Sequence, residues 1–282
     1  MSPYKIGVTG ANGYLGSQLV KSLRAKGYLV YALSRKEPQN KETEIFYKLG
    51  QEVDPAQISR LDTIIHCAYD FTIKEPLENH RVNVEGSLSL LRQASMYHIR
   101  FIFISSMSAF SGCKSQYGKN KLEVEHEVLI QKGAVIRPGL IYGEGDGGMF
   151  GSLHALVAKW SLIPVVGSGQ QILFPCHVND LVGLLERQIQ AEVPHPEPIL
   201  AVSEQALSLK QLLQGMAAKK NKKIAFLPIP WQLIWILLRV LEGLGVRMRM
   251  NSDSLVGLVC QDPKPDLRST RDLNLHFRSF FL

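Results

Sequence analysis

The stretch "VTGANGYLG", residues 8–16, decides the fold of this chain. The apolar run "YKIGVT" enters it with the length of a strand, and the helix-periodic segment "SQLVKSLRAKG" leaves it and stops at Gly27. Gly10, Gly13 and Gly16 therefore fall in a strand-to-helix turn, where they permit a sharp turn, a close approach of backbone N–H groups to a pyrophosphate, and tight helix packing. The stretch predicts a dinucleotide-binding loop at a helix N-terminus, and a tight turn without a ligand is the alternative.

Strands and helices alternate on both sides of this loop through the first half of the chain. Further strands are expected at "YLVYALS", "IFYKL", "LDTIIHCA", "IRFIFISS" and "AVIRPGLIYG", and long helices at residues 77–98 and 114–133. The strands are nearly continuous apolar runs, as in a parallel sheet that helices cover on both faces. The predicted fold is α/β, with a doubly wound (Rossmann) parallel sheet and a small C-terminal substrate lobe.

The alternation stops after Gly143, and this break sets the expected domain boundaries. We expect a dinucleotide-binding core at residues 1–145, to which residues 172–203 return. The substrate-binding lobe is expected to comprise residues 146–171 and 204–282, where short strands and helices mix with Pro and Gly.

Composition and charge limit the classes of function. The chain has 282 residues, a hydrophobic fraction of 45% and a net charge of +7, values of a globular protein that attracts anions. The basic residues are dispersed except in "AAKKNKK", residues 217–223, which is expected to be a solvated helix end, so nucleic acid is not an expected partner. The four cysteines form no CxxC pair and no metal-ligand pattern, which favours reduced thiols, a cytoplasmic protein and no metal site.

The most apolar stretch is "IPWQLIWILLRVLEGLGV", residues 229–246. Arg239 and Glu242 interrupt it, and the remainder is too short to span a bilayer. We expect a buried helix, with Trp231 and Trp235 packed in the core of the lobe, and an interfacial membrane helix is the other interpretation.

The end of the second strand, "ALSRK", bears on the choice of cofactor. A carboxylate at this point usually holds a free ribose 2′-hydroxyl, whereas a 2′-phosphate needs a cation. Ser34, Arg35 and Lys36 precede the first carboxylate, Glu37, and Arg35 offers bidentate hydrogen bonds to a phosphate. The sequence favours NADP(H), with NAD(H) possible, and two ordinary surface cations are the alternative.

In "SQYGKNKLEVE", residues 115–125, Tyr117 and Lys121 are four apart on an expected helix and share a face. A free phenol has a pKa of about 10, and a nearby ammonium lowers it. The pair predicts a general acid/base that moves a proton on or off an alcohol oxygen, assisted by a serine at the adjacent strand end. A chance pair on an amphipathic helix is the alternative.

Together these motifs resemble the short-chain dehydrogenase/reductase family of the extended, epimerase/dehydratase-like type. The likeness covers residues 4–190. The matching segments are "VTGANGYLG", "DTIIHCAY", "NVEGSLSLLRQA", "FISSMSAF", "YGKNK", "RPGLIYGEGDGG" and "CHVNDLVGLL".

The resemblance implies catalytic roles for three residues. Tyr117 would be the acid/base, and Lys121 would orient the cofactor ribose and lower the pKa of the tyrosine. Ser106 would hydrogen-bond the substrate oxygen, although Ser105 and Ser108 are close enough to be alternatives.

The resemblance also implies a set of binding residues. The cofactor is expected to contact Gly10, Asn12, Gly13, Tyr14, Leu15, Gly16, Ser34, Arg35, Lys36, Cys67, Ala68, Tyr69, Asn83, Tyr117, Lys121 and Pro138. The substrate is expected to contact Ser108 and Leu140. His66 is expected to be a core or loop histidine, and Asp180 to cap the helix that follows it.

Two departures from the family pattern concern the substrate. Many nucleotide-sugar members carry Asn where this chain has Leu140, and Arg in the stretch where it has Gln171 and Ile172. The leading hypothesis is nevertheless an NAD(P)-dependent oxidoreductase or epimerase that acts on a sugar hydroxyl or ketone, in a nucleotide sugar, with a homodimer as one possible assembly. The alternatives are an NADPH-dependent, hydroxysteroid-dehydrogenase-like reductase of a lipophilic ketone and a non-catalytic dinucleotide-binding protein.

Overall fold

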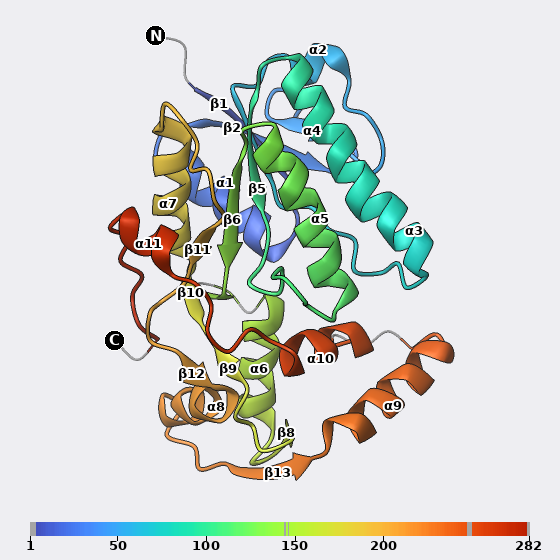
Figure 1. Cartoon of the computed structure of the whole chain (residues 1–282), viewed down its shortest axis with the longest axis vertical. Helices are drawn as coiled ribbons and strands as arrows, with labels where there is room; N and C mark the ends of the chain where they lie inside the picture. Colours follow the sequence, from blue (N-terminus) through green and yellow to red (C-terminus); the bar gives the residue numbers. More distant parts are fainter. Residues whose placement is uncertain (1–3, 144, 146, 247–249, 281–282) are drawn as a thin grey trace.

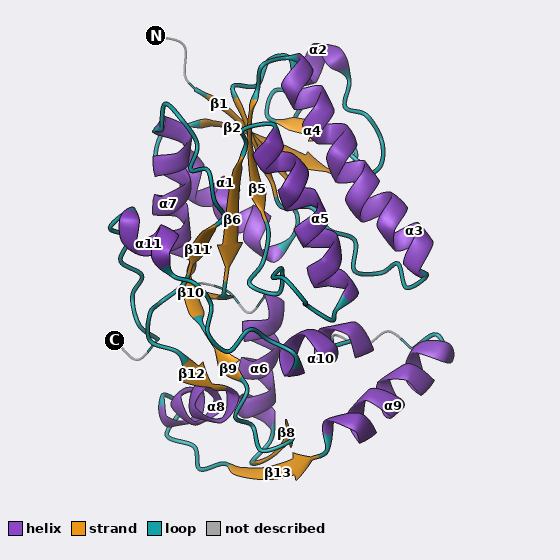
Figure 2. Cartoon of the chain, in the orientation of Figure 1, coloured by secondary structure: helices purple, strands orange, loops and turns teal. Residues whose placement is uncertain are grey.

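The computed structural model describes residues 4–143, 145, 147–246 and 250–280. Its centre is a seven-stranded sheet in the order β11-β6-β5-β4-β1-β2-β3, and every pair of neighbours is parallel (Figures 1 and 2). The strands of this sheet are β1 Lys5–Thr9, β2 Leu29–Ser34, β3 Glu44–Phe46, β4 Thr63–His66, β5 Arg100–Ile104, β6 Ala134–Pro138 and β11 Ile199–Ala201. The predicted doubly wound α/β fold is confirmed, and the strand order reverses between β1 and β4, where such sheets bind ligands.

Helices cover both faces of the sheet because its strands are apolar on both sides. Leu19 and Leu185 belong to the core under α1 and α7, and Leu90 and Val128 to the core under α4 and α5 on the other face. The helices around the sheet are α1 Tyr14–Ala25, α2 Pro55–Ile58, α3 Pro76–His80, η1 Arg81–Glu85, α4 Gly86–Met96, α5 Gln116–Ile130, α7 Val178–Gln190 and α11 Arg268–Asp272. The η1 segment is a π-helical turn inside the long helix that the sequence predicts.

The prediction of one continuous sixth strand is wrong in one respect, because the strand divides at Gly139. Its first half, β6, stays in the large sheet, whereas β7 Leu140–Tyr142 pairs with β10 Pro175–His177 in a separate two-stranded sheet. A Cβ on Gly139 would lie 1.9 Å from the carbonyl oxygen of Phe174, so only glycine allows this close crossing.

The remaining elements form a smaller region, hereafter the lobe, at the lower end of the molecule in Figure 1. Its elements are α6 Gly148–Lys159, β8 Leu162–Val166, β9 Ile172–Leu173, β12 Leu207–Ser208, α8 Leu209–Ala218, β13 Ala225–Ile229, α9 Trp231–Gly243 and α10 Ser252–Val259. They share an apolar core of their own around Leu212 and Ile163. Residues 144 and 146, in the loop matched to the family's substrate loop, lie outside the described residues.

The prediction that the apolar stretch 229–246 is a buried helix is wrong. The helix forms, as α9, but Leu238 is its only buried residue. Trp231 packs beside Leu238 and Leu255, whereas Trp235 is 37% exposed and does not lie in the lobe core.

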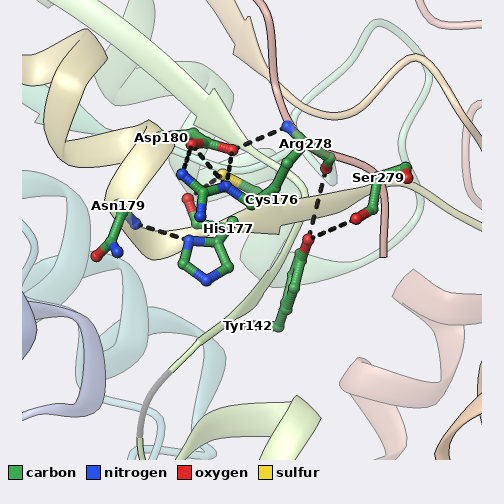
Figure 3. A network of polar contacts seen from close by, with 7 residues as sticks. All are labelled: Tyr142, Cys176, His177, Asn179, Asp180, Arg278 and Ser279. Carbon is green, nitrogen blue, oxygen red and sulfur yellow. Dashed lines mark hydrogen bonds and ion pairs between the residues drawn. The ribbon is translucent and has the colours of Figure 1, made fainter. Parts of the chain in front are cut away.

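Asp180 does not cap α7, contrary to the prediction. The cap is His177, whose Nδ1 accepts a hydrogen bond from the backbone N–H of Asn179 at 3.2 Å. Asp180 lies in the first turn of the helix and accepts from Arg278, whose backbone N–H and guanidinium reach it at 2.6–3.1 Å (Figure 3). The carboxylate therefore holds the C-terminal segment against α7, and Tyr142 reinforces this by donating to the carbonyl of residue 279 at 3.2 Å.

Candidate active site

The glycine loop has the shape that the sequence predicts. Gly10 has φ +65°, and a Cβ there would lie 3.1 Å from the backbone of Ala68. A Cβ on Gly16 would lie 2.2 Å from the carbonyl oxygen of Gly10, so α1 packs directly on the turn. Gly13 is the N-cap of α1, with no side-chain cap and no acidic residue in the first turn. The first N–H groups of α1 are thus left for a ligand, and the loop fits the pyrophosphate of a dinucleotide.

A buried polar chain fixes the end of β4 beside this loop. Thr9 Oγ1 accepts the backbone N–H groups of residues 67–68 at 3.0 and 3.1 Å, so its own hydrogen points to Nδ1 of His66 at 2.7 Å. His66 then carries its proton on Nε2 and donates to Ser87 at 2.9 Å, and Ser87 donates to the carbonyl of Asn83 at 2.6 Å. Burial, with a smaller contribution from the charge of Lys121, lowers the pKa of His66 to about 3. The prediction of a core histidine is confirmed.

The predicted catalytic pair meets its serine at the ends of α5 and β5. Ser106 lies close enough to Tyr117 to influence the pKa of its phenol, and the Lys121 ammonium lies 5.9 Å from the centre of the Tyr117 ring. Lys121 is 4% exposed and donates to the carbonyl of Ile104 at 2.8 Å. The helix spacing of four residues therefore brings both side chains to one place, as predicted.

The expected lowering of the Tyr117 pKa is not what this arrangement produces. Burial raises the pKa of Tyr117 to about 12, and the hydrogen bond from Ser106 opposes that rise only in part. Burial also lowers the pKa of Lys121 to about 8, against the opposing charges of Cys67 and Glu125. Desolvation dominates both groups, so the phenol is protonated near neutral pH.

The three serines after β5 differ in their surroundings. The Ser106 hydroxyl accepts the backbone N–H of Ser108 at 3.1 Å. Ser105 is 3% exposed, and its hydroxyl has no hydrogen-bond partner among the described residues. Ser106 and Ser108 both line the cavity described below, and Ser105 does not.

Two aromatic rings enclose Tyr117 on the side of the loop after β4. The Tyr69 ring is edge-on to Tyr117 at 4.8 Å between centroids, and the Phe71 ring lies at 5.3 Å. Phe71 is 57% exposed and was not among the predicted site residues. Nothing in the sequence distinguishes it from other loop aromatics.

Asn83 supports the site from behind. Its Oδ1 accepts the backbone N–H of Asp70 at 2.7 Å, and its Nδ2 donates to the Asp70 carbonyl and to Asn79, each at 3.2 Å. Asn79 also accepts from Asn120 of α5 at 2.8 Å and from Tyr69 at 3.2 Å. This network fixes the loop after β4 against α5, a positioning role that differs from the direct cofactor contact expected of Asn83.

Asp253 is a site residue that the sequence analysis missed. It lies on α10 of the lobe, and its carboxylate accepts the backbone N–H groups of Gln116 at 2.6 Å and Tyr117 at 3.0 Å. It thus caps α5 together with Ser115, whose hydroxyl accepts from Gly118 at 3.1 Å. "NSD" before an apolar run signals a helix start in the sequence, but not that its carboxylate serves a second helix.

A cavity of about 600 Å³ opens at the Tyr117 hydroxyl, between the sheet and the lobe. Of the predicted residues, it is lined by Tyr14, Tyr69, Ser106, Ser108, Tyr117, Pro138 and Leu140. Ile172, Trp235 and Arg239 close it from the lobe. The remaining predicted residues do not line this cavity, and among them Asn12 is exposed and Leu15 packs on the core.

A second cavity of about 550 Å³ lies beside the end of β2. Arg35 lines it and donates to Asp70 at 3.0 Å, and Ser34 accepts the backbone N–H of Lys36 at 3.3 Å. The other charged residues of its lining are the cations Lys48, Arg81 and Arg92 and the carboxylates Asp70, Glu78 and Glu85, and Arg81 donates to Glu78 at 2.6 and 2.7 Å. The cavity can therefore hold an anionic group next to Arg35.

Comparison with known proteins agrees with the fold and the dinucleotide loop described above. The model of the NAD dependent epimerase/dehydratase family matches residues 6–201. The chain is 27% identical to a UDP-glucose 4-epimerase of Vibrio cholerae, over 83% of this chain and 80% of the relative. It is 26% identical to a ceramide reductase of Caulobacter vibrioides, over 80% and 73%. An epimerase from Methanothermobacter thermautotrophicus shares the fold with a TM-score of 0.74 and 18% identity, covering 99% of this chain and 89% of that one.

Proposed function

The chain belongs to the NAD dependent epimerase/dehydratase family, and we propose that it is an oxidoreductase or epimerase acting on a hydroxyl or ketone of a nucleotide sugar. The observation that carries this proposal is that Ser106 and Tyr117 line one cavity, with Lys121 buried 5.9 Å from the centre of the Tyr117 ring. The match to a UDP-glucose 4-epimerase supports the substrate class.

In the proposed mechanism the protein handles the proton. A bound nicotinamide dinucleotide supplies the carbon that accepts or returns a hydride. Tyr117, protonated near neutral pH, donates its proton to a carbonyl oxygen when the substrate is reduced, and recovers one when a hydroxyl is oxidised. Ser106 hydrogen-bonds the same oxygen, and the ammonium of Lys121 stabilises negative charge on the phenol.

A Tyr117→Phe variant tests this assignment. We expect turnover to fall about a thousandfold, because the ring stays and only the proton donor is lost. Dinucleotide binding and the unfolding transition should stay unchanged. Turnover retained in the variant would exclude Tyr117 as the acid/base, whereas a wild-type protein that binds the dinucleotide and turns over no substrate would favour a non-catalytic dinucleotide-binding protein.

We further propose that the preferred cofactor is NADP(H), with the phosphate on the ribose held by Arg35. The position of Arg35 in the lining of the second cavity, at the end of β2, supports this preference. Arg35→Ala should weaken NADPH binding at least about tenfold and leave NADH binding unchanged, with Lys41→Ala as the control. Protein purified without added cofactor should release no NAD(H) on denaturation, and retained NAD(H) would contradict the assignment and point to a cofactor regenerated in each cycle.

A second candidate substrate is a lipophilic ketone. The cavity wall carries Leu140 and Ile172, where nucleotide-sugar members of the family have polar groups, and the ceramide reductase relative supports this reading. Turnover of UDP- and dTDP-sugars measured against that of long-chain ketones distinguishes the two.

We also propose residues 1–145 with 172–203 as the dinucleotide-binding core, and residues 146–171 with 204–282 as the substrate lobe, except that β9 at residues 172–173 pairs within the lobe and α11 at residues 268–272 packs on β11 of the core. The pairing of β11 with β6 and the packing of α7 beside α1 support the return of residues 172–203 to the core. The four unpaired cysteines support a reducing compartment such as the cytoplasm.

A further inference from the structure

Helix α9 exposes the apolar side chains that its sequence would normally bury. Five apolar residues at positions i, i+3, i+4, i+7 and i+11 form one exposed stripe along the helix and its C-terminus. They are Leu233, Ile236, Leu237, Val240 and Leu244, each 53–73% exposed. Isolated surface leucines are common, but a continuous stripe of this kind marks an interaction surface.

The small sheet next to α9 continues this surface. Strands β8 and β13 pair in parallel, and Pro164 stands opposite Leu227. Leu162 and Leu227 are 56% and 48% exposed, and Trp160, just before β8, is 52% exposed. These elements lie together at the lower end of the molecule, away from the large sheet (Figure 1). We name the α9 stripe with Trp160, Leu162 and Leu227 the outer apolar surface.

The charged residues of the elements around the outer apolar surface are basic with one exception. Helices α6 and α8 and strands β8, β9, β12 and β13 contain no Asp or Glu, and the one acidic residue of α9, Glu242, accepts hydrogen bonds from Ser252 of α10 and lines the cavity. The basic residues of these elements and of the segment after α8 are Lys159, Lys210, Lys219, Lys220, Lys222, Lys223 and Arg239. Protein partners usually offer charges of both signs, whereas an apolar face bordered mainly by cations complements an anionic lipid surface.

Length and tryptophan placement agree with a helix that lies in the membrane interface. Thirteen residues of α9 extend about 20 Å, against a hydrocarbon thickness of about 30 Å. Of the residues that the structure describes, none belongs to a helix able to cross a bilayer. Trp160, in the outer apolar surface, and Trp235, on α9, are 52% and 37% exposed, and tryptophan favours the interface.

We propose that the outer apolar surface docks this protein on an anionic lipid bilayer, with α9 parallel to the membrane plane. Helix α9 also supplies Trp235 and Arg239 to the wall of the cavity that contains Tyr117. Docking therefore brings the cavity to the lipid surface, whichever substrate the site takes.

Vesicle flotation of the purified full-length protein tests this proposal. We expect binding to phosphatidylcholine vesicles that contain phosphatidylglycerol, weaker binding at high salt, and little binding to phosphatidylcholine alone. Lys220→Glu with Lys223→Glu should lower the partition coefficient by about thirtyfold. Each lysine near an anionic membrane surface raises this coefficient by about fivefold. The control is Lys41→Glu with Lys132→Glu, which makes the same charge change on the other half of the molecule and should bind as the wild type does.

The apolar contribution is tested separately. Leu233→Asp with Leu237→Asp should abolish flotation, whereas Leu77→Asp with Val193→Asp, at residues 80% and 78% exposed, should leave it unchanged. In the unmodified protein, lipids with a spin label near the headgroup should quench tryptophan fluorescence. Wild-type protein that does not float with anionic vesicles would overturn the proposal. So would a dimer that the Leu233→Asp and Leu237→Asp changes dissociate, because a second copy would then cover this surface.

Discussion

The carboxyl edge of the large sheet buries polar side chains, whereas the outer end of the lobe exposes apolar ones. At the sheet edge His66 and Lys121 are polar side chains almost fully buried, and each has hydrogen-bond partners. On α9 the apolar side chains of Leu237 and Leu244 are 58% and 73% exposed. The buried polar groups of the sheet edge are satisfied by hydrogen bonds within the chain and contribute to the fold. The apolar side chains of α9 are not covered by the chain, and we expect a partner outside the chain to cover them.

The largest effect is expected at the glycine loop. Gly16→Ala would place a Cβ 2.2 Å from the Gly10 carbonyl oxygen, with no flexible side chain to yield. We expect a loss of about 4 kcal/mol or more of unfolding free energy, and loss of dinucleotide binding. Gly183→Ala is the matched control, because α7 has open space there and alanine favours a helix by up to about 1 kcal/mol. Urea unfolding of both variants measures the contrast, and equal effects would mean that the loop adjusts freely.

The next effect is a loss of stability in acid that comes from His66. Its pKa is about 3 in the folded protein and 6.5 when unfolded. Below pH 6.5 the unfolded chain binds a proton that the folded one does not, so the unfolding free energy falls as pH falls. The contribution of this histidine between pH 7 and pH 4.5 is about 3 kcal/mol at 1.4 kcal/mol per unit.

The His66→Gln variant isolates this contribution. The variant will be less stable at pH 7, but its unfolding free energy should change less between pH 7 and pH 4.5 than that of the wild type. Parallel stability curves for the two proteins would show that His66 is protonated in the fold, against the hydrogen-bond directions assigned to it.

A smaller effect, in a more alkaline pH window, is expected at Lys121. Its folded pKa of about 8 lies below the unfolded value of 10.5, so the folded chain binds fewer protons between these values and stability rises with pH in this window. At pH 7 the buried ammonium lowers stability, and Lys121→Met should raise the unfolding free energy by about 2 kcal/mol while removing turnover. The control is Lys119→Met, an exposed change on the same helix that should shift stability by less than about 0.5 kcal/mol.

A Lys121→Met protein that is less stable than Lys119→Met would contradict this account. It would mean that the hydrogen bond to Ile104 outweighs the desolvation of the ammonium. The wild type should also gain stability from pH 7.5 to pH 9.5, and the methionine variant should not.

The sequence predicted what depends on local pattern. Local spacing determines the relative positions of residues within a turn or a helix, because each has its own periodicity. This holds for the glycines at 10, 13 and 16 and for Tyr117 with Lys121. The parallel sheet followed from its apolar strands in the same way.

The errors arose where a contact comes from a distant segment. Asp180 has a partner almost a hundred residues away, and Asp253 caps a helix far from its own in sequence. The sequence around Gly139 does not indicate that the backbone of Phe174 packs against it. The pKa of Tyr117 depends on burial rather than on the neighbouring ammonium, and burial is a property of the whole packing.

The smallest change in unfolding free energy is expected for Leu237→Ala on α9, and it tests the contrast between the sheet edge and α9 most directly. Leu237 and Leu238 are neighbours with the same side chain, 58% and 4% exposed. Leu238→Ala should cost about 3 kcal/mol because it leaves a cavity, whereas Leu237→Ala should change the unfolding free energy by less than about 0.5 kcal/mol. Thermal unfolding without lipid measures both. A large loss from Leu237→Ala would mean that this side chain already packs within the chain, and the contrast between the two regions would disappear. A negligible loss, together with loss of vesicle binding in the same variant, would mean that Leu237 serves only the membrane contact.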